Sequence, residues 1–69
     1  MTKKICNELR RLRFEQQEMT QQALATAVGV SRQTIVAIEK GKYSPSLEVA
    51  FKIADVFGLS IEQVFSFKE

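Results

Sequence analysis

The sequence predicts an all-α domain of five short helices, with a short strand in its last residues. Three observations support this prediction: apolar residues recur at helical spacing, serine or threonine precedes four of the segments, and glycine follows three of them. The 69 residues are 45% hydrophobic and 26% charged, which is typical of a globular chain and not of a disordered one. Because no linker, repeat or biased segment interrupts residues 1–69, we treat them as one domain.

The first predicted helix covers residues 4–17. Ile5, Leu9 and Leu12 recur there at spacings of four and three, which places them on one face of a helix. We expect this face to be buried.

The second predicted helix covers residues 21–28. Thr20 can accept a backbone N–H of the first turn, and Met19 can pack back against Leu24 as a hydrophobic staple. Gly29 can end the helix in the left-handed conformation that such ends favour.

The third predicted helix, residues 32–40, begins after a second cap at Ser31. Ile35 and Ile38 point inward in this helix, which ends at Gly41. The composition of residues 41–45, which contain glycine, serine and proline, predicts a loop.

The fourth predicted helix covers residues 47–57 after a cap at Ser46. Glu48, Lys52 and Asp55 form its single polar stripe, so we expect it to be buried on most sides. Gly58 ends it, and Ser60 begins a fifth helix over residues 61–65. Apolar and polar residues alternate in 64–68, which fits a short strand.

The cationic side chains are concentrated in the first part of the chain. Residues 1–43 contain eight lysines and arginines against four acidic residues, whereas residues 44–69 contain two against four. Clustered cations favour a polyanionic partner, although a solvated surface explains the same imbalance.

Several classes of function are not expected from this composition. The chain has no histidine and a single cysteine, Cys6, so an internal disulfide, a zinc site and the commonest general base are missing. We expect no enzyme, no cofactor and no metal. Because no apolar run approaches the ~18 residues of a membrane span, we also expect no membrane partner.

Residues 21–40 have the pattern of two helices joined by a tight turn that contains a glycine, the helix-turn-helix unit. Ala25 is small where the two helices cross, and Gly29 permits the sharp turn. The apolar underside would consist of Leu24, Val28, Val30, Ile35 and Ile38.

This pattern resembles the Cro/C1-type (Xre family) helix-turn-helix of bacterial, archaeal and phage transcriptional regulators. The resemblance is carried by Thr20-Gln21-Gln22-Ala23-Leu24-Ala25, by Gly29-Val30-Ser31-Arg32-Gln33-Thr34-Ile35 and by Ile38-Glu39-Lys40-Gly41, and it continues to Val64-Phe65. It implies a five-helix lambda-repressor-like DNA-binding domain of the small stand-alone type, cytoplasmic and associated with the nucleoid. The segment from Arg13 to Thr20 is one residue longer than the commonest family spacing.

In such a fold, the helix over residues 32–40 would lie in the major groove of double-stranded DNA. The base-reading candidates are the outward residues Arg32, Gln33, Val36 and Ala37. Gln33 can pair with adenine, Arg32 can bind guanine or a phosphate, and the two apolar residues suit thymine methyl groups. The alternative for Arg32 and Gln33 is a solvated start of the helix.

Other residues would orient the helix without reading bases. Gln21 lies at a helix N-terminus, where anions are favoured, and the family uses its matching glutamine on phosphate. The further phosphate candidates are Ser31, Thr34, Lys40, Lys42 and Tyr43; capping is the safer role for Ser31, and Tyr43 could equally cover the edge of the core. The resemblance also suggests a structural ion pair between Arg13 and Glu39.

The second half of the chain suggests a homodimer. An apolar surface larger than one small core needs would be formed by Val49, Ile53, Val56, Phe65 and Phe67. A two-fold dimer would hold two reading helices ~34 Å apart, on a near-palindromic operator. The favoured hypothesis is therefore a homodimeric repressor without a small-molecule ligand; the alternatives are a monomer with a larger core and a protein-interaction module, such as an antitoxin or an adaptor.

Overall fold

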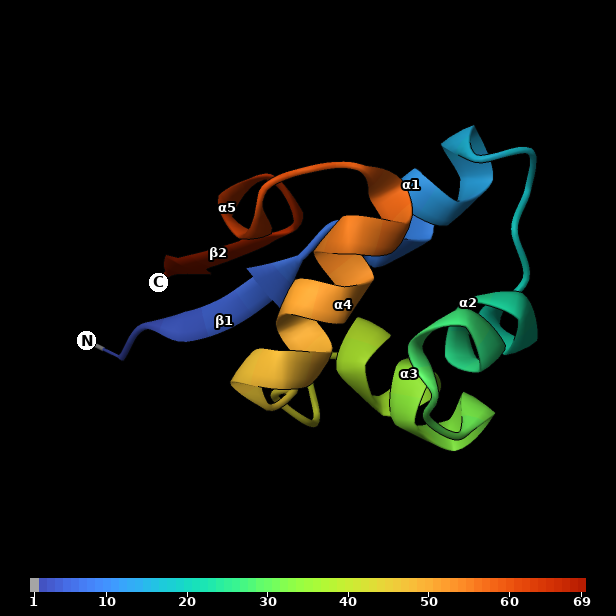
Figure 1. The fold of residues 1–69 in the computed structure, drawn as a ribbon. Helices are drawn as coiled ribbons and strands as arrows, with labels where there is room; N and C mark the ends of the chain where they lie inside the picture. The colour runs from blue at the N-terminus through green and yellow to red at the C-terminus, as the bar shows by residue number, and fades with distance from the viewer. Residues whose placement is uncertain (1) are drawn as a thin grey trace.

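The computed structural model describes residues 2–69, which form five helices and two strands (Figure 1). In chain order these elements are β1 (Lys4–Asn7), α1 (Leu9–Glu15), α2 (Gln21–Val28), α3 (Arg32–Glu39), α4 (Leu47–Phe57), α5 (Ile61–Val64) and β2 (Phe65–Lys68). The five-helix fold and the short C-terminal strand are confirmed. No helix within residues 2–69 is long and apolar enough to cross a membrane.

The first predicted helix is wrong at its start, because residues 4–7 form a strand. β1 pairs antiparallel with β2, so that Ile5 lies opposite Phe67 and Lys4 opposite Lys68. Leu9 and Leu12 are buried on α1 as expected, whereas Ile5 is 43% exposed and shares no helix face with them. The pairing with β2, sixty residues away in sequence, outweighs the local helical spacing.

α2, α3 and α4 begin where their caps predict, and α2 and α4 end at the predicted glycines, whereas α3 ends at Glu39, one residue before the predicted end. The hydroxyls of Thr20, Ser31 and Ser46 accept the backbone N–H groups of Ala23, Thr34 and Val49. Gly29 and Gly58 end α2 and α4 with φ of 88° and 67°, the left-handed region that favours glycine. These local signals account for the accuracy of the predicted boundaries.

The corner between α1 and α2 lies in the segment that the resemblance predicts to be one residue longer than usual. Gln17 and Glu18 both have φ of 56°, and the Met19 N–H then donates to the Arg13 carbonyl at 2.8 Å. Two successive left-handed residues therefore turn the chain just after α1, and Met19 and Thr20 then lead into α2.

The core lies between the helices, with β1 and β2 at one end of the molecule. Leu9, Leu24, Ile35, Ile53 and Val64 are all fully buried in it. The prediction that α4 is buried on most sides is wrong. Only Ala50, Ile53 and Ala54 of α4 are buried, because one face of the helix is enough to close so small a core.

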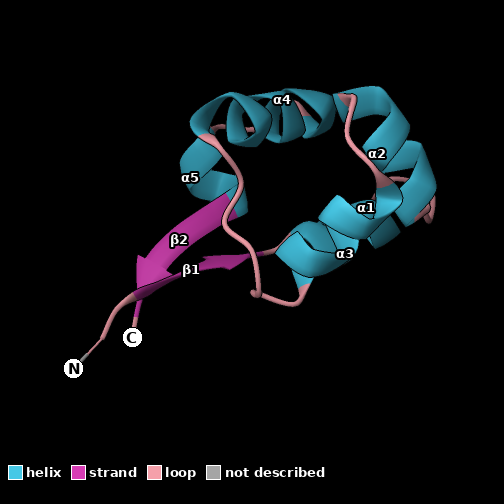
Figure 2. Cartoon of the chain, turned by 90° about the horizontal axis from the view of Figure 1, so that it is seen from below, coloured by secondary structure: helices cyan, strands magenta, loops and turns pink. Residues whose placement is uncertain are grey.

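β1 and β2 lie near opposite ends of the chain and form a two-stranded antiparallel sheet, the terminal sheet, which extends from the helical body (Figures 1 and 2). Two further contacts hold it in place. The Glu8 N–H donates to the Val64 carbonyl at 3.0 Å, and Asn7 Nδ2 donates to the Ile38 carbonyl, at the end of α3, at 2.8 Å. The terminal sheet is thus tied to the last turn of α3.

Candidate nucleic-acid interface

The crossing of α2 and α3 decides which side of α3 faces solvent. Ala25 is fully buried between these helices, and its carbonyl accepts the backbone N–H groups of both Gly29 and Val30. Ile35 and Ile38 are buried against the core. With this side of α3 facing inward, the helical period of 3.6 residues points the opposite side away from the protein.

The outward side of α3 contains the predicted base-reading residues. Arg32 and Gln33 are exposed, while Val36 and Ala37 are partly exposed. Within residues 2–69, no side-chain hydrogen bond or ion pair engages Arg32 or Gln33. Their polar groups therefore remain available to an external partner.

A cleft of about 620 Å³ lies beside this surface, between α1, α2 and α3. It brings together four predicted contact residues from two helices: Gln21, Arg32, Val36 and Lys40. The remaining lining residues are Arg10, Arg13, Thr20, Gln22 and Glu39. Four of the nine are cationic and one is anionic, so the cleft favours a negatively charged ligand.

The single carboxylate of the cleft is neutralised by Arg13. The Arg13 guanidinium pairs with both carboxylate oxygens of Glu39, with Nη2 to Oε1 at 3.0 Å, and the two side chains are only 14% and 9% exposed. Arg13 Nη1 also donates to the Met19 carbonyl at 2.8 Å, and Gln21 Nε2 donates to Glu39 Oε1 at 3.2 Å. The predicted ion pair therefore links α1, α2 and α3 and holds the Gln21 amide in place.

The predicted phosphate-binding residues differ in how free their polar groups are. The Ser31 and Thr34 hydroxyls lie 2.9 Å apart and bond to each other, and Ser31 also caps α3. Lys40 and Lys42 are exposed at the end of α3. Tyr43 is 52% exposed, so its hydroxyl end can reach a partner from the α3–α4 loop.

Arg10 is a cleft residue that the sequence analysis missed. It lies three residues before Arg13 on α1, and this spacing places both on one helix face. The neighbouring Arg11 points elsewhere: it pairs with Glu8 and Glu15, and its hydrogen bonds to Glu8 and then Glu15 raise the pKa of its guanidinium. Arg10 has no such ion pair within residues 2–69 and adds a cation to the cleft.

The predicted dimer residues do not form one exposed surface. Ile53 is fully buried in the core and cannot contact a second chain; this part of the prediction is wrong. Val49, Val56 and Phe65 are partly buried against the core, and Phe67 is 63% exposed. The prediction missed Leu47 and Phe51 of α4, which are 70% and 55% exposed and lie four residues apart on one helix face.

A helix-turn-helix family model matches residues 9–64, most of the chain and the whole of the site just described. The chain belongs to the helix-turn-helix family. The match begins at α1 and ends at α5, so β1 and β2 lie outside it.

Similar proteins share this assignment. An uncharacterised HTH-type transcriptional regulator of Methanocaldococcus jannaschii is 61% identical over 51 residues, covering 74% of this chain and 77% of the relative. The transcriptional repressor RstR of the cryptic phage CTXphi, from Vibrio cholerae, is 36% identical over 63 residues, covering 91% of this chain and 56% of RstR. The helix-turn-helix protein described here is thus a transcriptional regulator of the HTH type.

A solved structure supports the fold independently. The crystal structure of a candidate DNA-binding protein from Bacteroides fragilis superposes with a TM-score of 0.78 at 27% identity. The superposition covers 90% of this chain and 98% of that one.

Proposed function

We propose that this helix-turn-helix regulator is a homodimeric repressor that binds double-stranded DNA sequence-specifically, with α3 in the major groove. The observation that carries the proposal is the outward side of α3, where Arg32 and Gln33 are exposed and engage no other side chain within residues 2–69. These two side chains are suited to the hydrogen-bonding edges of guanine and adenine. Val36 and Ala37 follow on the same side and suit thymine methyl groups.

Phosphate contacts would flank the reading helix on both sides. Gln21, Arg10 and Lys40 border the cleft beside α3, and Lys42 and Tyr43 follow from its C-terminal end. Such contacts fix the register of a protein on the duplex without reading its sequence. The bonded network of Arg13, Glu39 and Gln21 would hold this arrangement rigid before DNA binds.

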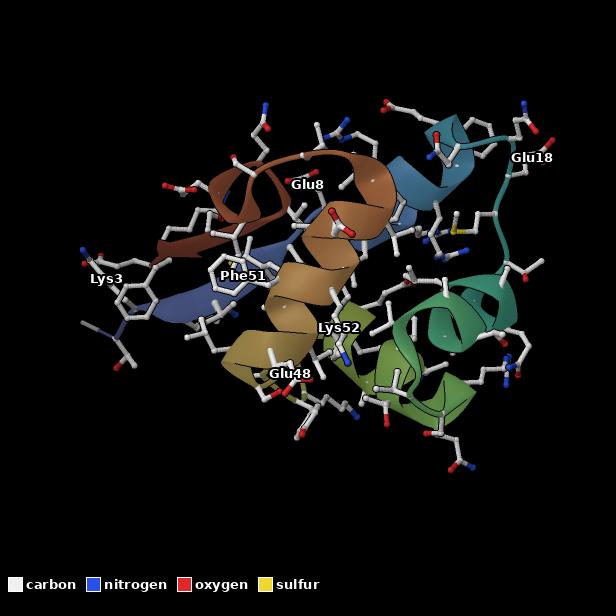
Figure 3. All side chains as sticks on the ribbon, in the orientation of Figure 1. Lys3, Glu8, Glu18, Glu48, Phe51 and Lys52 are labelled. Atoms are coloured by element: carbon white, nitrogen blue, oxygen red, sulfur yellow. The ribbon has the colours of Figure 1, made fainter. Side chains whose placement is uncertain are left out.

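The exposed apolar side chains support a two-fold dimer, on a surface revised from the sequence prediction. Leu47 and Phe51 lie on one face of α4, and Ile5 and Phe67 form a cross-strand pair in the terminal sheet. Phe51 projects from α4 on the side of the terminal sheet (Figure 3). Side chains this large and exposed are typical of a contact surface, and two-fold pairing would favour a near-palindromic operator.

Repression is the simplest mode of action for so small a regulator. A dimer bound over a promoter excludes polymerase by occupancy alone, and RstR, a relative of this chain, is named a repressor.

The test is selection of bound sequences from a randomised duplex pool, with Arg32→Ala/Gln33→Ala in parallel. Lys52→Ala is the matched control, because Lys52 lies on α4 and pairs with Glu48. Enrichment of a palindrome by the wild type and the control, but not by the double variant, supports the proposal. Weak binding without enrichment, unchanged in the double variant, contradicts base reading by α3.

A second candidate function is a protein-interaction module, favoured by the same exposed apolar side chains. An antitoxin or adaptor of this fold would use Leu47, Phe51 and Phe67 on another protein and not on a second copy. Sedimentation equilibrium separates the two: a dimer that Phe51→Lys converts to monomer supports homodimerisation. A wild type that is monomeric and selects no duplex favours the module.

A further inference from the structure

The cations of the terminal sheet are not explained by the helix-turn-helix motif. The chain has ten lysines and arginines, and within residues 2–69 three of them, Arg11, Arg13 and Lys52, form ion pairs. Of the seven others, Arg10, Arg32, Lys40 and Lys42 lie on α1, on α3 or just after α3. The remaining three are Lys3, Lys4 and Lys68, at the end of the terminal sheet that is farther from α1 and α5.

The register of the terminal sheet brings like charges together. Lys4 lies directly opposite Lys68 in the antiparallel pair, and such a cross-strand pair of like charges is destabilising. Lys3 lies over Phe67, on the opposite face of the sheet from Lys68, with its Nζ 5.8 Å from the centre of the Phe67 ring. An anion placed against Lys4 and Lys68 would relieve their mutual repulsion.

A groove connects the terminal sheet to the proposed DNA surface. It has a volume of about 260 Å³ and runs between β1 and the end of α3, with Lys4 on one side and Lys40 and Gly41 on the other. Lys40 also lines the cleft beside Arg32, so one lysine borders both hollows. The carboxylate that lines the groove, Glu39, is already paired with Arg13, which leaves the groove cationic.

The terminal sheet is held in a fixed position relative to α3. The Asn7 side chain donates to the Ile38 carbonyl at 2.8 Å and accepts the Leu9 N–H at 3.1 Å, which joins β1 to α3 and to α1. The view from below shows β1 ending close to α3 (Figure 2). If a DNA duplex binds to α3, Lys4 and Lys68 of the terminal sheet therefore lie at a defined place along the phosphate backbone.

We propose that Lys4 and Lys68 form a second phosphate-binding element, which extends the DNA interface beyond the matched motif along the backbone flanking α3. The inference rests on the proposed DNA-binding function. The partner is the phosphate backbone of double-stranded DNA, and the contacts are independent of base sequence. Within residues 2–69, the exposed Glu69, next to Lys68, is the only acidic residue at this end of the terminal sheet.

The experiment measures the salt dependence of DNA binding for Lys4→Gln/Lys68→Gln. Each lysine that meets a phosphate contributes about 0.9 to the slope of log Kobs against log salt concentration, so the double variant should lose up to about 1.8 per protomer. The loss should be equal on a selected duplex and on one of unrelated sequence. Lys4→Arg/Lys68→Arg should keep the wild-type slope. Lys52→Gln should also leave the slope unchanged, because Lys52 lies on α4 away from the terminal sheet (Figure 3).

The outcomes distinguish this inference from the proposed DNA-binding function on which it rests. A wild type that binds no duplex overturns both. Wild-type binding with an unchanged slope in the double glutamine variant overturns the second phosphate element alone. A changed oligomeric state with an unchanged slope also overturns it, and assigns the lysines to acidic residues of a second copy. We expect each variant to keep the fold, because both lysines are exposed. Circular dichroism of each variant checks this.

Discussion

Replacing Glu39 with glutamine tests how much the ion pair with Arg13 stabilises the fold. The substitution keeps size and shape but removes the charge, and it places an NH₂ group where one carboxylate oxygen now accepts a guanidinium N–H. The Arg13 side chain is 14% exposed, so little water can replace the lost partner. A buried charge left without its partner costs about 3–5 kcal/mol.

The expected loss is at or just below the lower limit of this range. Arg13 keeps its hydrogen bond to the Met19 carbonyl and has some exposure, so we expect about 2–3 kcal/mol. A domain of this size has a total stability of about 3–10 kcal/mol, and such a loss lowers Tm by about 10–20 °C. Urea unfolding and thermal melting, followed by circular dichroism at constant protein concentration, measure both quantities.

Glu15→Gln is the matched control, because Glu15 pairs with Arg11 in an exposed ion pair. It should cost less than about 0.5 kcal/mol. Combining Arg13→Met with Glu39→Gln should destabilise less than the sum of the single changes, since no unpaired charge remains. If Glu39→Gln costs no more than Glu15→Gln, the ion pair does not brace the three helices and the reasoning fails.

Three further predictions concern the turn between α2 and α3, the terminal sheet and the proposed dimer. Gly29→Ala should lower the free energy of unfolding by about 1–2 kcal/mol, because φ is 88° there; an unchanged urea midpoint would argue against this strain. Asn7→Ala should increase amide hydrogen exchange in β1 and at Gly41 more than in α2, since it removes the link to α3; equal protection in all three would contradict that link. Phe67→Ser should raise the dimer dissociation constant at least tenfold in sedimentation equilibrium, while Phe14→Ser, equally exposed on α1, should leave it unchanged.

Local signals in the sequence predicted the middle of the fold well. The bounds of α2 and α4 and the starts of α3 and α5 follow from a hydroxyl cap before each helix, and Gly29 and Gly58 mark the ends of α2 and α4. Each signal acts within one turn of its helix. Side chains nearby in sequence are therefore sufficient to predict it.

The strand at the start of the chain could not be predicted in this way. Ile5 has a helical spacing to Leu9, and its strand partner, Phe67, is sixty-two residues away. Such pairing depends on where the two chain ends meet in space, which only the packed helices determine. The exposed side of α4 was missed for a related reason: Leu47 and Phe51 are as apolar as the buried Ile53, and residue type does not reveal which side faces the core.

The candidate site was predictable where it depends on one helix and not where it depends on several. Once Ile35 and Ile38 face the core, the helical period alone places Arg32 and Gln33 outward. Arg10 joins the cleft only because α1 passes beside α2 and α3. Lys4 reaches the same side through β1, so no local pattern could indicate it.

The most direct test of the central claim is the binding of Gln33→Ala to every single-base variant of the selected operator. If α3 reads bases in the major groove, the wild type should discriminate by about 1–3 kcal/mol at the position that Gln33 contacts. The variant should lose that discrimination at this position in both half-sites and keep it elsewhere. A variant that binds all sequences more weakly by the same factor, with every preference retained, would contradict base reading by α3.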